Sequence, residues 1–343
     1  MDNILISVVI PFKINDLIYF DQLVDCLYSY SDSCCEFIFV DDYSDENLSK
    51  LAETKVKRIR NSIFLRNKEN LGVSHSRNRG IEVSIGEYIM FVDSDDLIDI
   101  RILNDLPAII KKMSCNSLLC LKMEYFDNSP DFSSNYHSPI VSKTTQANEA
   151  IQNYLYFDEY YNPFMFKSAC GKLFCKKILR DNNLRFNISL KHYEDSLFVS
   201  EYSFLVNSVV LLDSPTFYFY RRNSISASNK FDDSLILQIN NYYDLYKEKC
   251  PSLYNTLALD TIYLFIPYLI KNHSIGKKRV KFYDVNSILK TPFISEAIFN
   301  FKNFKLYGCK SQYLIRLQKL LKNAPRLIWA RYIYFITKKY LMS

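Results

Sequence analysis

The 343-residue sequence lacks any apolar run long enough to cross a membrane. The longest candidate, residues 261–270, is shorter than the roughly 20 residues that a bilayer requires, and it contains Pro267. The first residues, Met1 to Ile4, also lack the basic region that opens a signal peptide. We therefore expect a cytoplasmic protein that is not inserted in a membrane.

The nine cysteines form no Cys-x-x-Cys pair. Cys34 and Cys35 are adjacent, and two further pairs are five residues apart, which matches neither a zinc site nor a disulfide scaffold. With no signal peptide, these spacings predict reduced thiols in a cytosol.

Acidic residues are missing from the end of the chain. Residues 297–343 contain ten Lys or Arg and no Asp or Glu, although the net charge of the whole chain is only +6. Two amphipathic helices are predicted there, at 313–322 and 325–340. Basic amphipathic helices favour anionic membrane surfaces, with about 1 kcal/mol for each basic residue.

Two explanations of this basic tail, residues 313–341, remain open. The tail either docks on an anionic membrane surface or packs on the rest of the protein with a solvated basic face. Nucleic acid would attract the same charge, but no nucleic-acid-binding motif accompanies it, so we expect no nucleic-acid partner.

Three carboxylates crowd into four residues directly after an apolar run. Residues 88–92 predict a buried strand, so Asp93-Ser94-Asp95-Asp96 follow its carboxyl end. Ligands of open α/β sheets bind outside these strand ends, and adjacent carboxylates repel each other unless a cation neutralises them. The cluster therefore holds a divalent cation with a ligand's phosphates, or else Asp95 or Asp96 caps a helix that begins near Asp99.

Strand and helix patterns alternate over the first hundred residues. This alternation predicts a parallel sheet with helical crossovers. Because parallel strands end at one edge, Asp41 and Asp42, which follow the strand at 37–40, should lie near the acids at 93–96. The other predicted strands are 6–11, 59–65, 117–126, 209–212 and 216–220; the predicted helices are 18–30, one from about 44, 72–83, 147–156 and 193–206, with mostly helix after 231 and a loop at 128–142.

Residues 70–80 form a second unusual stretch. Gly72 precedes a predicted helix, and the free N–H groups of a helix start favour an anion. Arg77 and Arg79 point in different directions, so one can reach a phosphate and the other can reach the acids. A solvated helix face with scattered arginines is the alternative.

Taken together and in order, seven segments resemble family 2 glycosyltransferases. They are residues 7–11, 39–44, 70–80, 93–96, 171–174, 193–198 and 217–222. The resemblance implies the GT-A fold, an α/β, Rossmann-like, mostly parallel nucleotide-binding sheet flanked by helices. We expect this catalytic domain at 1–226, with a nucleotide-sugar half of about 1–115 and an acceptor half of about 116–226. A mostly helical region that matches no family motif follows at 227–343.

The resemblance also implies how a nucleotide sugar would be held. The backbone around Pro11 and the acids Asp41 and Asp42 would contact the base and ribose. Arg77 and Asn78 would steady the base and diphosphate.

Asp93 and Asp95 match the family's DxD motif. Asp95 would bind Mn²⁺ or Mg²⁺ directly, with Asp93 as the second ligand, Ser94 beside the nucleotide sugar and Asp96 as a secondary candidate. A divalent cation stabilises the charge that develops on a leaving nucleoside diphosphate.

Asp195 matches the family's general base, which an incoming hydroxyl needs within hydrogen-bond reach. Glu194 is a secondary candidate. Acids in a first helical turn also stabilise the helix dipole, so the pair has a purely structural explanation as well. Arg221 or Arg222 would lie near the diphosphate and add charge-assisted hydrogen bonds.

Two departures from the family pattern stand out. The Gln-x-x-Arg-Trp motif of processive synthases is absent, since the single tryptophan is Trp329, and Tyr43 replaces the usual small residue after the paired acids. The missing motif predicts that one sugar is added per binding event. The DxD acids predict metal dependence, and a single base with in-line attack predicts inversion.

The expected donor is a UDP sugar. The expected acceptor is a glycan, lipid-linked, in bacterial surface polysaccharide synthesis (capsule, O-antigen or lipooligosaccharide) at the inner face of the cell membrane. The alternatives are a sugar nucleotidyltransferase, whose glycine- and arginine-rich loop is absent at 11–14, and a non-catalytic nucleotide-binding module, which would lack the DxD or the base.

Overall fold

The computed structural model describes residues 4–127, 130, 132, 136–147, 167–222, 234–251, 290, 292–303, 318, 319 and 322. The helices expected at 147–156, 313–322 and 325–340 lie almost entirely outside these residues. The chain divides into two compact units, Met1–Ile151 with Tyr161–Asn223, and Gln152–Tyr160 with Ser224–Ser343.

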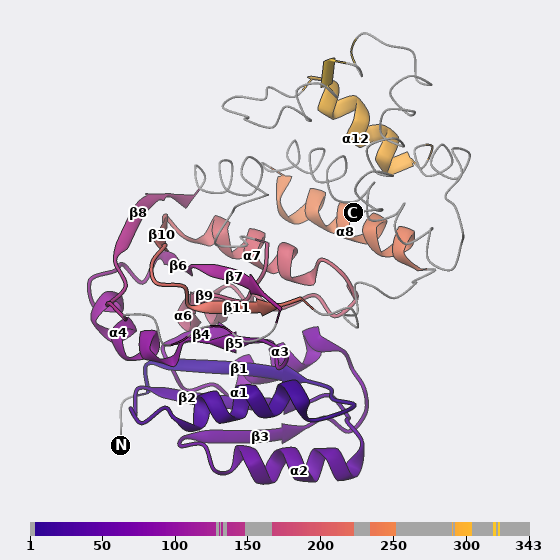
Figure 1. Cartoon of the computed structure of the whole chain (residues 1–343). Helices are drawn as coiled ribbons and strands as arrows, with labels where there is room; N and C mark the ends of the chain where they lie inside the picture. The colour runs from indigo at the N-terminus through magenta and orange to yellow at the C-terminus, as the bar shows by residue number, and fades with distance from the viewer. Residues whose placement is uncertain are drawn as a thin grey trace. The chain divides into compact units, whose positions relative to one another are not determined.

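The first unit is built on an eight-stranded sheet in the order β3-β2-β1-β4-β9-β6-β10-β8 (Figure 1). Its strands are β1 (Ile6–Phe12), β2 (Cys35–Asp41), β3 (Ser62–Arg66), β4 (Tyr88–Phe91), β6 (Ser117–Leu121), β8 (Val141–Gln146), β9 (Lys172–Cys175) and β10 (Ser208–Leu212). Pairing is parallel except that β9 runs antiparallel to β4 and β6, and β8 antiparallel to β10. The expected α/β fold with a mostly parallel sheet is confirmed.

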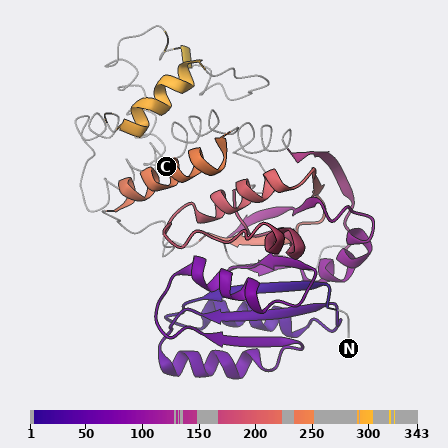
Figure 2. The ribbon, with the colours of Figure 1, turned by 180° about the vertical axis from the view of Figure 1, so that it is seen from behind.

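Helices flank this sheet on both sides (Figures 1 and 2). They are α1 (Ile18–Tyr28), α2 (Glu46–Val56), α3 (Val73–Val83), α4 (Ile100–Ile110), α6 (Lys176–Asp181) and α7 (Glu194–Leu205). Every residue of β1, β2 and β4 is buried, as expected for central strands covered on both faces. Helix α3 packs so closely on β1 that a Cβ on Gly80 would lie 2.2 Å from Val9 Cγ1.

A second, three-stranded sheet has the order β5-β11-β7. It contains β5 (Leu97–Ile98), β7 (Met123–Phe126) and β11 (Tyr218–Arg221), with β11 parallel to β7 and antiparallel to β5. This sheet follows the acidic segment at 93–96 directly, because β5 begins at Leu97.

The prediction of a single strand at 117–126 was wrong, because this segment is divided at Lys122 between the two sheets. The Lys122 N–H donates to Leu212 O of the large sheet, whereas Lys122 O accepts from the N–H groups of Phe217 and Tyr218 on the approach to β11. Lys122 therefore pairs with one sheet through its N–H and with the other through its carbonyl oxygen. The apolar pattern of residues 117–126 gives no sign of this change.

Two further expectations need correction. Strand β8 begins within the segment expected to be a loop, and its mostly exposed side chains explain why no apolar pattern marks it. Helix α4 is capped by Asp99, whose Oδ1 accepts from Arg101 N at 3.1 Å, and not by Asp95 or Asp96. The capping explanation for the acidic cluster is therefore excluded.

Within the described part of the second unit, the elements are the helices α8 (Leu235–Lys249) and α12 (Pro292–Asn303). This agrees with the helical character expected after residue 231. Among the residues described in either unit, no helix is long and apolar enough to span a bilayer.

Candidate active site

Arg77 joins acids from two distant parts of the first unit. The guanidinium, on α3, is 4% exposed, and its Nη2 donates to Asp93 Oδ1 at 3.0 Å. Its Nη1 donates to Glu194 Oε1 at 3.1 Å and to Asp195 Oδ1. The acidic segment after β4 and the start of α7 therefore meet at one cation.

The charges at this meeting point are unbalanced, since three carboxylates face one guanidinium. Burial alone would lower the pKa of Arg77, but Asp195, Asp93 and Glu194 together hold it well above its usual value. Burial raises the pKa of Glu194 to about 8, and the neighbouring Asp195 adds to this rise. Burial also raises the pKa of Asp195, against the opposing effect of Arg77. An aspartate with a raised pKa is a stronger base than an ordinary one.

Asp195 is held from two sides. Its Oδ1 contacts Arg77, and its Oδ2 accepts from the Ala169 N–H at 3.1 Å. It lies in the first turn of α7, where the helix dipole favours a negative charge. Tyr193, in the left-handed conformation with φ 66°, directs the chain into this turn.

Strand β11 holds the acidic segment in place. The Tyr218 hydroxyl accepts from Asp93 N at 3.1 Å and donates to Asp96 Oδ2 at 2.6 Å. The Arg221 N–H donates to Asp96 Oδ1 at 2.7 Å, and Arg221 Nε donates to Asp95 O at 2.7 Å. Burial raises the pKa of Asp96 to about 8, with Asp93 and Asp95 adding to the rise. Asp96 is thus the inner anchor of the segment, while Asp93 and Asp95 are partly exposed.

The two arginines at the end of β11 differ in environment. The Arg221 guanidinium lies 4.2 Å from the Tyr19 ring centroid and 4.4 Å from that of Phe126, and burial lowers its pKa. Arg222 is exposed and lies 3.6 Å from Asp127. Contact of either arginine with a diphosphate stays a prediction.

Asp41 is buried at the end of β2, with protein partners at both oxygens. Its Oδ1 accepts from Ser44 N at 2.9 Å, and its Oδ2 accepts from Ser49 Oγ at 2.5 Å and lies 3.4 Å from Arg66 Nε. Asp41 thereby fixes the turn into α2.

Asp42 has the same function for the loop that leads into α3. Its Oδ1 accepts from Asn67 Nδ2 at 2.8 Å and from Leu71 N at 2.9 Å, and its Oδ2 accepts from Gly72 N at 2.8 Å. The sequence pointed to both acids as nucleotide ligands. Their contacts with protein make them organisers of the surrounding loops, and contact with a nucleotide stays a prediction.

Asn78 also has protein partners at both ends of its amide. Nδ2 donates to Phe186 O at 2.9 Å, and Oδ1 accepts from Phe186 N at 2.8 Å. The Phe186 ring lies 5.2 Å from the Arg77 guanidinium, so this contact helps to enclose Arg77. Pro11 is buried near the end of β1 and pairs with Val40.

The carboxylates suit a divalent cation that arrives with a diphosphate. Asp93, Ser94 and Asp95 offer oxygen atoms, the ligands that Mg²⁺ and Mn²⁺ prefer. In the part of the chain that the structure describes, no three His, Cys, Asp or Glu side chains converge to hold a metal by themselves. One or two carboxylates are enough when substrate phosphates complete the coordination shell, so the residues present fit the metal.

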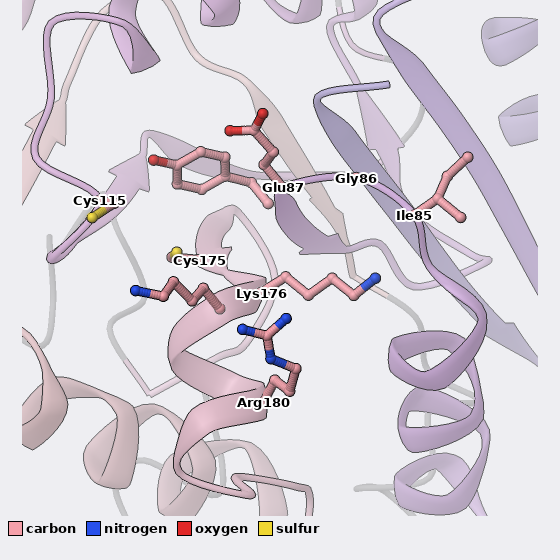
Figure 3. A pocket seen from close by; sticks show the side chains of 9 residues that line it. Ile85, Gly86, Glu87, Cys115, Cys175, Lys176 and Arg180 are labelled. Carbon is pink, nitrogen blue, oxygen red and sulfur yellow. The ribbon is translucent and has the colours of Figure 1, made fainter. Parts of the chain in front are cut away.

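A separate cavity of about 420 Å³ lies at the opposite end of β4. Figure 3 shows Lys176 and Arg180 of α6 beside it, with Glu87 and Cys115 across from them. None of the predicted site residues lines this cavity. It is therefore distinct from the carboxylate cluster.

Three contacts at the site were missed from the sequence. Tyr218 lies in the aromatic segment before Arg221. The sequence pointed to this region, but only its arginines were predicted as site residues. Ala169 acts through its backbone N–H and Phe186 through its ring and backbone, so no local pattern marks either of them.

Residues 7–182 match the family model described as glycosyl transferase family 2. The chain is 28% identical to the teichoic acid poly(glycerol phosphate) polymerase of Staphylococcus epidermidis over 74% of its own length, and it spans 33% of that protein. It is 23% identical to the glycosyltransferase GlyG of Streptococcus pneumoniae, with 66% of this chain and 74% of that protein covered. The chain thus covers about a third of the length of the first relative and three quarters of the second.

Solved structures share the fold. The structure of Staphylococcus aureus TarS residues 1–349 in complex with UDP-GlcNAc superposes with a TM-score of 0.57. The sequence identity is 18%, and the match covers 98% of this chain and 90% of that one. The complex of the same protein with UDP gives a TM-score of 0.52 at 20% identity, over 87% of this chain and 88% of that one.

Proposed function

The chain belongs to glycosyl transferase family 2, and on that basis we propose that it transfers one sugar from a UDP sugar to a glycan acceptor with inversion at the anomeric carbon. The observation that carries this proposal is the meeting of Asp93 with Asp195 at Arg77. A carboxylate suited to bind a metal with a diphosphate and a carboxylate suited to accept a proton are thereby brought to one place. We assign catalysis to residues 1–226, with the donor in about 1–115 and the acceptor in about 116–226.

The donor is a nucleotide sugar at the carboxyl ends of β1, β2 and β4. The complexes of TarS with UDP and UDP-GlcNAc support a uridine donor. Asp95 and Asp93 would hold Mn²⁺ or Mg²⁺, which supplies positive charge for the leaving diphosphate when bound. The remaining donor contacts are assigned to Pro11, Asp41, Asp42, Arg77, Asn78 and Ser94, and to one of the two arginines, Arg221 or Arg222.

Asp195 is the general base in this proposal. Arg77 and the Ala169 N–H fix the orientation of its carboxylate, and each carboxylate oxygen has lone-pair capacity beyond these bonds. The burial that raises its pKa makes it better able to accept a proton from the attacking hydroxyl. With one base and one displacement, the hydroxyl attacks opposite the leaving group and the configuration inverts.

The acceptor is a glycan of the bacterial cell surface. The names of the relatives support this class, including the teichoic acid polymerase of S. epidermidis and the poly(ribitol-phosphate) β-N-acetylglucosaminyltransferases of S. aureus. A lipid-linked acceptor at the inner membrane face, reached through the basic tail at 313–341, is part of the proposal.

Asp195→Asn tests the base. We expect UDP release from a panel of UDP sugars to need Mn²⁺ or Mg²⁺ in the wild type, and transfer to an acceptor to fall by about 10²–10⁴-fold in the variant while the Kd for UDP changes little. Asp181→Asn, which changes an exposed acid beside Arg180, is the control. An equal loss of UDP affinity would make Asp195 a binding residue, and full transfer by the variant would move the base to Glu194.

A further inference from the structure

Tyr125 and Tyr220 lie side by side near the ends of β7 and β11, and the proposed mechanism uses neither of them. They are register partners on parallel strands. Their ring centroids are 5.4 Å apart, and the ring planes meet at 81°. Tyr125 is 54% exposed and Tyr220 is half-buried. The two rings therefore form an aromatic corner, hereafter the tyrosine corner, that solvent reaches.

The tyrosine corner lies on the same face of the small sheet as Tyr218, the residue that holds the acidic segment. Side chains alternate along a strand, so Tyr220 shares its face with Tyr218, and Tyr125 shares its face with Met123. The Tyr218 hydroxyl bonds to Asp93 N and to Asp96 Oδ2. The corner therefore lies one strand repeat, roughly 7 Å, beyond the anchor of the acidic segment.

Electrostatics agree with this placement. Burial raises the pKa of Tyr220, and Asp96, Asp93 and Asp95 each add to the rise, in that order. Charge on these three acids is thus felt at the Tyr220 hydroxyl. The corner is therefore within electrostatic range of the acidic segment at 93–96.

The chemistry of the corner suits a neutral sugar ring. Tyrosine offers a rigid ring for apolar C–H groups and a polar tip for hydroxyls. The Arg222 guanidinium lies over one face of the Tyr125 ring, 5.0 Å from the ring centroid, and 3.6 Å from Asp127. This exposed pair provides both donors and acceptors with no net charge.

We propose that Tyr125 and Tyr220 form the acceptor subsite, on which a neutral sugar ring of the acceptor stacks beside the donor. This inference rests on the proposed glycosyltransferase function and adds to it the class of group that the acceptor presents near the reaction. The tyrosine corner selects a pyranose ring through its apolar face, and Arg222 and Asp127 bind hydroxyls at the edge of that ring.

The test compares Tyr125→Ala with two matched variants. Tyr125→Phe keeps the ring and removes the hydroxyl. Tyr28→Ala removes an equally exposed tyrosine, at 54%, that also lies under an arginine, with Arg58 4.8 Å from its centroid, but on α1. The probes are methyl β-N-acetylglucosaminide, methyl β-glucoside and methyl β-galactoside, observed by saturation-transfer NMR in the presence of UDP and Mn²⁺.

We expect saturation of the ring protons of at least one glycoside with the wild type, Tyr125→Phe and Tyr28→Ala. For Tyr125→Ala we expect about a tenfold weaker Kd with an unchanged Kd for UDP. Equal glycoside binding by Tyr125→Ala, or no glycoside binding by the wild type, would overturn the subsite. A parallel loss of UDP affinity would assign the corner to the donor instead. Metal-dependent hydrolysis of UDP sugars by the wild type is measured in the same experiment. If this hydrolysis is absent, the glycosyltransferase proposal itself fails. If it is present and Tyr125→Ala binds glycosides as well as the wild type does, only the acceptor subsite is wrong.

Discussion

At the scale of single residues, the site depends on Arg77. Its buried guanidinium contacts Asp93, Glu194 and Asp195, and burial raises the pKa values of the last two. Desolvated carboxylates are tolerated only while a partner remains beside them. In the proposed mechanism, Arg77 therefore serves stability and catalysis through the same contacts.

Replacing this cation should be costly. We expect Arg77→Met to lower the free energy of unfolding at pH 7 by about 3–5 kcal/mol, because it leaves buried carboxylates without a counter-charge. Urea denaturation measures this loss. It should shrink at pH 5, where the uncompensated acids take up protons.

Arg79→Met is the matched control on the same helix. Arg79 Nη1 donates only to neutral oxygens, Arg66 O at 2.7 Å and Asn67 Oδ1 at 2.8 Å. Its loss should cost less and should not depend on pH between 5 and 7. Equal costs for both variants would mean that the three carboxylates do not rely on Arg77.

We expect Glu194 to make stability depend on pH. Its pKa is raised from 4.5 to about 8, so between these values the folded protein holds a proton that the unfolded chain has released. Stability should therefore fall as pH rises through this window. Asp96 adds a term of the same sign, since its pKa is also raised to about 8.

Glu194→Gln removes one of these two terms. We expect the urea midpoint of the wild type to decrease between pH 5.5 and 8.5, and the decrease to be smaller in the variant. An unchanged pH profile would show that Glu194 titrates normally in the folded protein.

At the scale of elements, β11 determines where the acidic segment lies. The Tyr218 hydroxyl bonds to Asp93 N and Asp96 Oδ2, and Arg221 bonds to Asp95 O and Asp96. The proposed metal ligands thus receive their positions from a strand more than a hundred residues later. If the hydrogen bonds from β11 to the acidic segment were weakened, the first effect should be weaker metal binding.

Tyr218→Phe tests this hold. The variant leaves the part-buried Asp93 N–H and a buried Asp96 oxygen without one partner each, which costs about 1–3 kcal/mol. We expect a several-fold higher Mn²⁺ concentration for half-maximal hydrolysis of the UDP sugar. Tyr202→Phe is the control, because Tyr202 is also fully buried and its hydroxyl bonds only to Cys175 N, at 2.8 Å. If both variants lose stability and neither changes the metal requirement, β11 does not position the ligands.

At the scale of the whole molecule, the uneven charge of the chain is its main unexplained feature. Residues 297–343 contain ten basic residues and no acidic residue, while the rest of the chain is mildly acidic. In the proposal above, this asymmetry attracts the basic tail to an anionic membrane surface.

Removal of residues 325–343 tests the membrane proposal. We expect weaker binding to vesicles that contain anionic lipid, a decrease of wild-type binding with salt, and unchanged metal-dependent hydrolysis of UDP sugars by the shortened protein. Vesicle sedimentation and UDP release measure these effects. Vesicle binding equal to that of the full chain would show that the tail is not the docking segment.

The sequence by itself determined the fold of the N-terminal part of the large sheet. Apolar runs at 6–11, 37–40 and 88–92 alternate with helical patterns, and local hydrophobic periodicity is enough to predict buried parallel strands. The order of the strands along the chain then placed Asp41, Asp42 and the acids at 93–96 at one edge, and the ordered motifs pointed to Asp195.

Only the tertiary structure decided how these residues act together. Arg77 reaches Glu194 across 117 positions, Tyr218 reaches Asp96 across 122, and Lys122 divides one apolar run between two sheets. Asp42 bonds to Asn67 across 25 positions and Asn78 to Phe186 across 108, which their residue types alone do not disclose. The physical reason is that these contacts join surfaces brought together only by packing, so no pattern within a short stretch of sequence records them.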